Sequence, residues 1–123
     1  MANVDLELKK QFKELQIKVG ETRSKMRQID GTIDILSRSS QRYRLTLTEV
    51  KNLPESITTY QSIGRMFVKA KRDEIEVDLN EAIKTNAEKC QELEKSKVYL
   101  EKGLKEKEDS IRELISQKQA QLS

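Results

Sequence analysis

The spacing of apolar residues in the first third of the chain most strongly constrains its fold. Between residues 8 and 43, apolar side chains recur at alternating steps of three and four, and charged or polar residues fill nearly all the positions between them. This spacing forms a narrow apolar stripe on one side of a helix, as in a coiled-coil seam. The stripe comprises Leu8, Phe12, Leu15, Val19, Thr22, Met26, Ile29, Ile33, Leu36, Ser40 and Tyr43, of which Thr22 and Ser40 are polar. Gly20 and Gly31 weaken this helix, so it needs a partner.

The same spacing returns after Arg72 and predicts a second long helix. Its stripe comprises Leu79, Ile83, Asn86, Cys90, Leu93, Lys97, Leu100, Leu104, Lys107, Ile111 and Leu114. Asn86, Lys97 and Lys107 interrupt it, which is typical of positions that set register and partner choice. Alternating Glu and Lys residues around the stripe suit a helix surrounded by water.

The composition excludes several classes of protein. Charged residues make up 37% of the 123 residues and hydrophobic ones 35%, whereas average soluble domains are about 25% charged and about 45–50% apolar. The chain therefore lacks a thick core. Basic and acidic residues are interleaved along the chain and nearly cancel, to a net charge of +3. No large surface of one charge is therefore available, and we expect no nucleic-acid binding. No run of roughly 18 apolar residues is available for a membrane span.

The residue inventory also argues against an enzyme. The chain has no histidine, which rules out a Ser-His-Asp relay and imidazole-bound zinc within it. Its single cysteine, Cys90, has no partner for an internal disulfide, and a reducing, cytoplasmic compartment fits best. There is no Gly-rich phosphate loop. We therefore expect no catalytic residues, no metal and no cofactor.

The only proline, Pro54, lies between the two helical stripes and excludes a continuous helix. After it come β-forming residues, with Gly64 free to adopt a positive φ in a tight turn. The sequence thus predicts a mainly α fold, a long antiparallel two-helix coiled coil with one β-hairpin between the helices. The single domain, residues 1–123, contains a helix at about 5–44, a linker and hairpin at about 45–70, and a helix at about 72–120.

The two stripes close against each other when facing residue numbers add to 119, which places Val19 opposite Leu100 and Thr22 opposite Lys97. A slip by one heptad also closes the seam and places Met26 opposite Leu100. The sequence leaves both registers open.

The hairpin carries apolar residues on both faces. A two-stranded hairpin is marginal in water, and its edges expose unpaired backbone groups. We therefore expect it to join other subunits, with closure into a barrel as the economical solution. The assembly residues are Ile57, Tyr60, Ile63, Gly64, Met66, Phe67 and Val68.

The helix–hairpin–helix order, Leu53-Pro54 and the stretch Tyr60-Gln61-Ser62-Ile63-Gly64-Arg65-Met66-Phe67-Val68-Lys69 resemble β-type prefoldin subunits, which have one hairpin. The opening Val4-Asp5-Leu6-Glu7-Leu8 and the residues that follow it to Gln16 share this resemblance. It covers nearly the whole chain.

The resemblance implies a hetero-hexamer containing two α-type and three other β-type subunits, with hairpins closing a double β-barrel and coiled coils extending as tentacles. It further implies ATP-independent binding of unfolded polypeptides, principally actin and tubulin, at the tips, and delivery to the cytosolic chaperonin. Candidate tip residues are Val4, Leu6, Leu8, Phe12, Ile111, Leu114, Ile115 and Leu122. For Leu8, Phe12, Ile111 and Leu114, the alternative is that they simply complete the seam. The alternative is a structural coiled-coil adapter or tether without chaperone activity.

Overall fold

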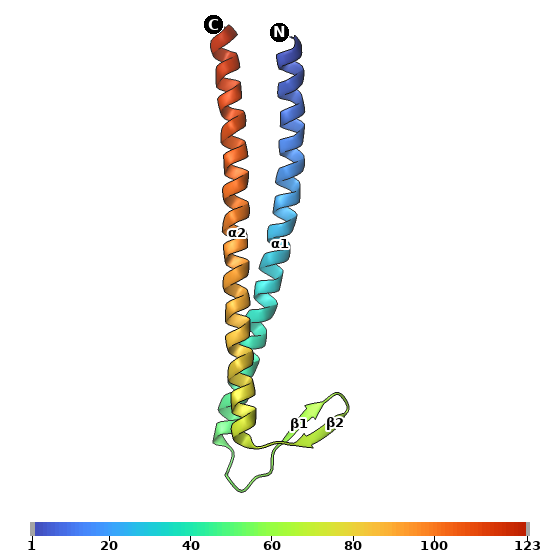
Figure 1. Ribbon diagram of the computed structural model, residues 1–123, viewed down its shortest axis with the longest axis vertical. Coiled ribbons are helices and arrows are strands. Elements are labelled where there is room, and N and C mark those ends of the chain that lie inside the picture. The colour runs from blue at the N-terminus through green and yellow to red at the C-terminus, as the bar shows by residue number, and fades with distance from the viewer. Residues whose placement is uncertain (1, 123) are drawn as a thin grey trace. The chain divides into compact units, whose positions relative to one another are not determined.

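A computed structural model describes the backbone of residues 2–122 and the side chains of residues 5–121. The elements follow the order α1 (Ala2–Asn52), β1 (Tyr60–Ile63), β2 (Met66–Lys69) and α2 (Arg72–Leu122) (Figure 1). This order confirms the predicted mainly α fold with one hairpin between two long helices. Over residues 2–122, neither helix has a stretch that is both long enough and apolar enough to cross a membrane.

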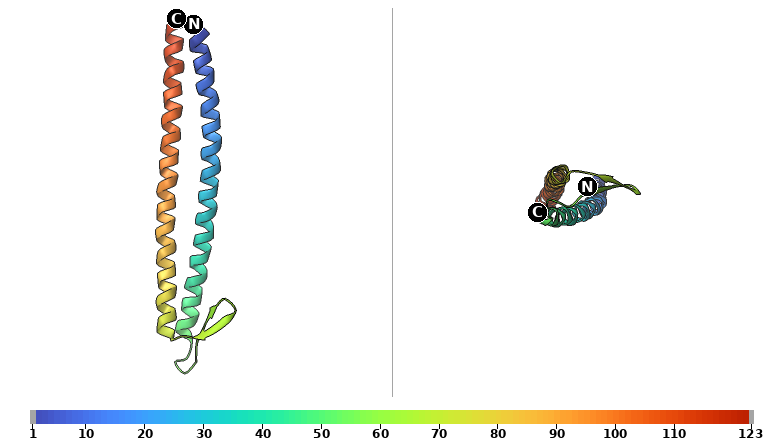
Figure 2. Two further views of the ribbon diagram at one scale, coloured as in Figure 1. Left: turned by 45° about the vertical axis from the view of Figure 1, so that its right-hand side comes forward. Right: turned by 90° about the horizontal axis from the view of Figure 1, so that it is seen from below.

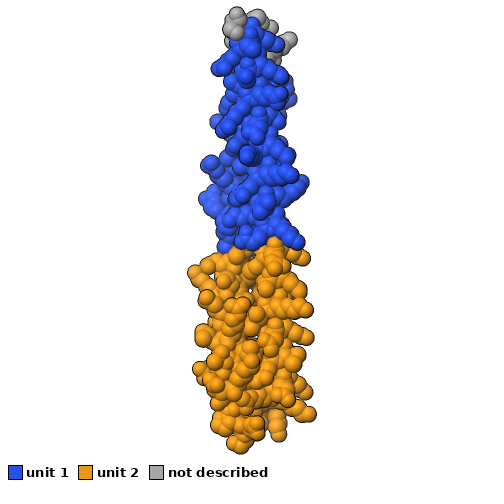
Figure 3. All heavy atoms as spheres, turned by 90° about the vertical axis from the view of Figure 1, so that its left-hand side faces the viewer, with its two compact units in different colours: residues 1–31, 93–123 blue, residues 32–92 orange. Residues whose placement is uncertain are grey.

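The chain divides into two compact units, which Figure 3 distinguishes by colour. The terminal unit combines residues 1–31 with residues 93–123, and the hairpin unit comprises residues 32–92. In each unit a part of α1 runs antiparallel to a part of α2 (Figures 1 and 2). The terminal unit therefore contains both ends of the chain, and the hairpin unit contains the strands.

Helix α1 continues to Asn52, beyond the predicted end near residue 44. The added residues include Leu47 and Val50, which extend the three-four spacing from Tyr43 and are half-buried. The seam therefore supports the helix further than predicted, and the linker that was expected from about residue 45 begins only after Asn52. Pro54 lies two residues after Asn52, where its ring prevents another helical turn.

Burial largely follows the predicted seam. Most seam positions on both helices are half-buried, and Thr22 and Ile111, at 4% and 8% exposure, are the two buried residues among the described side chains. The chain on its own thus has a narrow contact line rather than a core, as its composition predicts.

The seam departs from the prediction at Phe12 and Lys107, which are both exposed. Gln11 and Glu108 are half-buried instead. From Val19 back to Leu8 the half-buried positions are spaced by four, four and three residues, and the same spacing leads from Leu100 to Ile111. An 11-residue repeat follows a straight helix more closely than a heptad does, so Phe12 and Lys107 rotate out of the seam.

Contacts between the helices favour the slipped register. In the terminal unit, Lys97 pairs with Asp30 at 2.8 Å, although the register with Val19 opposite Leu100 would place Lys89 opposite Asp30. In the hairpin unit, Arg72 bonds to the backbone carbonyls of Lys51 and Leu53. The numbers of the paired residues add to 127 for Asp30 and Lys97, 125 for Leu53 and Arg72, and 123 for Lys51 and Arg72. All three sums are nearer to the 126 of Met26 opposite Leu100 than to the 119 of Val19 opposite Leu100.

Candidate assembly and client-binding surfaces

The hairpin turns at Gly64 and Arg65. Gly64 has φ +62°, the only positive φ among the described residues, and a glycine at the first central position fits a type II′ turn, whose twist matches that of the strands. The strands pair Tyr60 with Lys69, Gln61 with Val68, Ser62 with Phe67 and Ile63 with Met66. The tight turn expected around Gly64 therefore comprises Gly64 and Arg65, because Ser62 and Ile63 belong to β1.

This pairing separates the apolar side chains onto two faces, since successive strand residues point in opposite directions. Tyr60 and Phe67 lie on one face, and Ile63, Met66 and Val68 lie on the other. Every residue of both strands is exposed, with Phe67 at 75%. Ile57, which lies before β1, is also exposed. We call these six apolar side chains the hairpin surface.

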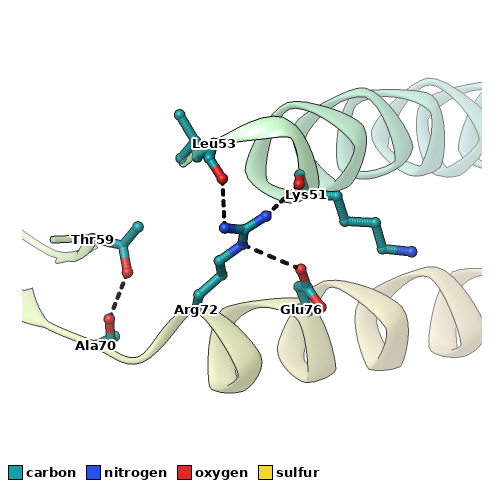
Figure 4. Close-up of polar contacts among 6 residues, drawn as sticks. All are labelled: Lys51, Leu53, Thr59, Ala70, Arg72 and Glu76. Atoms are coloured by element: carbon teal, nitrogen blue, oxygen red, sulfur yellow. Dashed lines mark hydrogen bonds and ion pairs between the residues drawn. The ribbon is translucent and has the colours of Figure 1, made fainter. Parts of the chain in front are cut away.

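Arg72 fastens the base of the hairpin to the end of α1 (Figure 4). Its guanidinium donates to the carbonyl oxygen of Leu53 at 2.5 Å and to that of Lys51, and its Nε lies 3.7 Å from the Glu76 carboxylate. The last carbonyls of a helix lack partners within the helix and attract cations. Arg72, the first residue of α2, therefore caps the preceding helix.

One further pair of contacts extends the hairpin toward the helices. The Thr59 hydroxyl donates to the Ala70 carbonyl at 2.6 Å, and the Ala70 amide donates to the Thr59 carbonyl at 3.1 Å. The Ile57 amide donates to the Pro54 carbonyl at 3.1 Å, which closes a turn in the linker. These bonds connect the strands to the helix ends without covering any strand side chain.

The predicted tip residues differ in burial within the terminal unit. Leu6 and Phe12 are exposed, Leu8, Leu114 and Ile115 are half-buried, and Ile111 is buried between the helices. The side chains of Val4 and Leu122 lie outside the described residues. Ile115 lies four residues after Ile111, and it is half-buried because the strict heptad spacing is not kept in this part of the helix.

Ile17 was not among the predicted tip residues, although it is 56% exposed. It lies eleven residues after Leu6, which is three turns, so both occupy the same side of α1. That spacing is visible in the sequence and could have identified it. Leu6, Phe12 and Ile17 therefore form the exposed apolar set of this unit on α1, which we call the tip surface.

An ion pair joins the two helices of the terminal unit near the chain ends. Lys118 of α2 pairs with Asp5 of α1. An open groove of 310 Å³ lies between the helices and is lined by Gln11, Glu14, Leu15, Lys107, Ser110, Ile111 and Leu114. Among the described residues, no group of three or more Cys, Asp or Glu side chains is placed to hold a metal ion.

Comparison with known families identifies the class of protein. A family described as prefoldin subunit matches residues 7–118. The fold is similar to that of the crystal structure of the prefoldin beta subunit from Thermococcus strain KS-1, with a TM-score of 0.63 and 23% identity over 81% of this chain and 90% of that one. The chain belongs to the prefoldin family.

Curated relatives show which prefoldin subunit it resembles. Prefoldin subunit 1 of Tetraodon nigroviridis is 47% identical and that of Homo sapiens 43% identical, each over 98% of both chains. Prefoldin subunit 1 of Arabidopsis thaliana is 35% identical over 86% of this chain and 83% of its own length. The chain is thus a prefoldin subunit similar to subunit 1, and prefoldin subunits are chaperone components that assemble with one another.

Proposed function

We propose that this chain is a β-type subunit of a hetero-hexameric prefoldin, joined through the hairpin surface to two α-type and three other β-type subunits. The hairpin surface carries this proposal, because its apolar side chains are exposed on both faces while the chain is alone. Neighbouring hairpins that pair along the strand edges would satisfy unpaired backbone groups and cover these faces together.

Native mass spectrometry of the complex, purified through a tag on this chain from its own cells, tests the assembly. We expect a hexamer that contains one copy of this 14.3 kDa chain and five different companions. Recovery of the chain as a monomer or homodimer, or with folded partners from outside the family, would instead support a structural adapter or tether.

The proposed activity is ATP-independent binding of unfolded polypeptides at the tip surface, in the cytoplasm, followed by delivery to the cytosolic chaperonin. Leu6, Phe12 and Ile17 expose apolar side chains on a single helix, where they can adapt to many unfolded sequences. Individual contacts of this kind are weak, and simultaneous binding at several tips multiplies their strength. Unfolded actin and tubulin are the clients that we propose.

Serine at Leu6, Phe12 and Ile17 tests client binding. The complex with this variant should assemble with unchanged helicity, because these side chains are outside the buried contact, but it should suppress the aggregation of diluted, guanidine-unfolded actin less well. The control is serine at Val98 and Tyr99, which are also exposed and belong to the same unit but lie on α2. If both complexes assemble and suppress aggregation equally, the tip surface is excluded as the client site. The proposed assembly is unaffected by that outcome.

A further inference from the structure

One exposed surface of the hairpin unit is used neither by the seam nor by the hairpin. Ile35 and Leu45 on α1 are 67% and 69% exposed. They are ten residues apart, close to three turns, and so lie on the same side of the helix. Arg38 and Arg42 lie between them, and a shallow hollow of 420 Å³ is lined by these four residues and Gln41. We call these five residues the basic-apolar surface.

The positive charge of this surface has little compensation nearby. Residues 35–48 contain three arginines and no acidic residue. Arg38 pairs with Asp34 at 3.0 Å, but both side chains are largely exposed, and exposed ion pairs contribute little. Arg42 donates to the Ser39 hydroxyl at 3.3 Å. Both guanidinium groups therefore remain accessible to an acidic partner.

Charge is divided between the helices only in the hairpin unit. There, α1 residues 32–52 contain four basic and two acidic residues, whereas α2 residues 72–92 contain three basic and seven acidic ones. In the terminal unit the balance is nearly even, with seven basic and five acidic residues in 1–31 and seven basic and six acidic in 93–123. The division thus coincides with the part of the chain that carries the hairpin surface.

We propose that the basic-apolar surface binds the acidic first part of helix α2 of the neighbouring prefoldin subunit. The inference rests on the proposed assembly, since pairing of the hairpins would bring the helices of adjacent subunits together at this end. Acidic residues are favoured where a helix begins, and in this chain the first part of α2 is strongly acidic. A contact between α1 of one subunit and α2 of the next is heterologous and suits a closed ring.

Such a contact would contribute to the order of subunits in the ring. Complementary charges across an interface select the partner and disfavour like-charged neighbours. Ile35 and Leu45 supply the apolar area that a purely ionic contact lacks, and both become covered on assembly.

Charge reversal in the assembled complex tests this contact. The variant is Arg38→Glu with Arg42→Glu, and the matched control is Arg23→Glu with Arg27→Glu, an exposed pair of equal spacing in the terminal unit. We expect the first variant to leave the complex about ten times faster than the control, as measured by exchange with labelled wild-type chain. Equal exchange rates for the two variants would overturn the proposal.

A zero-length cross-link identifies the occupant. Carbodiimide joins lysine amines to carboxylates, so Arg42→Lys introduces a reactive amine while keeping the charge. The new link, absent from the wild-type complex, should reach a carboxylate in the first part of α2 of another prefoldin subunit. If the hexamer forms but the new links lie only within this chain, or lead to a client or to the chaperonin, the proposed contact is refuted. Failure of the wild-type chain to enter a hexamer would instead refute the proposed function, and the inference with it.

Discussion

At the scale of single residues, Lys97 shows how a charge is accommodated in the seam. Its position follows Leu93 and precedes Leu100, where a charged side chain is costly unless it has a partner. The Asp30 carboxylate lies 2.8 Å from its ammonium and raises the pKa of Lys97, mainly through the hydrogen bond and then through charge attraction. Because Lys97 can reach Asp30 only in registers near the observed one, this pair also specifies the alignment of the helices.

The raised pKa of Lys97 predicts a pH-dependent contribution to stability. The folded state holds the proton more tightly than the unfolded state, so the contribution is complete below the ordinary lysine pKa of about 10.4 and is lost as pH rises through the raised value. Asp30→Asn should therefore lower the Tm at pH 8, and this difference from wild type should shrink as the pH rises through the raised pKa of Lys97. Thermal unfolding followed by circular dichroism measures both.

Asp34→Asn is the control, because it removes an exposed pair whose partner, Arg38, stays charged throughout this range. Its Tm difference should remain constant. A constant difference for Asp30→Asn as well would show that the Lys97 ion pair does not contribute.

At the scale of the elements, the observed register predicts which cysteines can be joined. In a Cys90→Ser background, Met26→Cys with Leu100→Cys should form a disulfide readily, because these positions face each other in the slipped register. Val19→Cys with Leu100→Cys should form it slowly, since the two positions are then one heptad apart. Non-reducing gel mobility after mild oxidation distinguishes the two, and the opposite order would restore the register with Val19 opposite Leu100.

Arg72, at the start of α2, bonds to carbonyls at the end of α1, so changing it should lower the local stability there. Arg72→Lys keeps the charge but removes the planar fork that reaches two carbonyls. We expect the local opening free energy to fall by about 1–2 kcal/mol, or roughly tenfold faster amide exchange at Leu53 and Ile57. Mass-spectrometric hydrogen exchange measures this, with Arg65→Lys in the exposed turn as control. Unchanged exchange at both amides would mean that the cap is dispensable.

The sequence predicted the elements better than it predicted their ends and contacts. The three-four stripes, and the β-forming residues around Gly64, are local signals, so the sequence alone predicts both helices, the hairpin and the positive φ of Gly64. Phe12 and Lys107 were misplaced because a strict heptad was extended across a segment that follows an 11-residue repeat. The Arg72 cap joins groups 19 and 21 residues apart, and no periodic pattern predicts it. Ile111 was a candidate both for the tip and for the end of the seam, and its burial places its side chain in the seam.

At the scale of the whole molecule, the exposed residues matter more than the buried ones. Only Thr22 and Ile111 are buried among the described side chains, so the chain alone buries little of its apolar surface. Apart from Val77, Val98 and Tyr99 on α2, the large exposed apolar side chains fall into three sets, namely the hairpin surface, the basic-apolar surface and the tip surface. The first two belong to the hairpin unit and the third to the terminal unit, which assigns proposed assembly and proposed client binding to separate parts of the chain.

The hairpin surface gives the sharpest prediction about assembly. Tyr60→Asp with Phe67→Asp places two carboxylates on one face of the hairpin, where burial against another subunit would remove them from water at high cost. The chain should keep its helical circular dichroism, because both side chains are outside the seam, and it should be absent from the purified hexamer. Val98→Asp with Tyr99→Asp is the matched control, with exposures of 62% and 77% against 60% and 75%. Because this control changes equally exposed residues on α2, it should enter the complex at normal stoichiometry. Co-purification of the hairpin variant at that same stoichiometry would show that subunits do not assemble through this face.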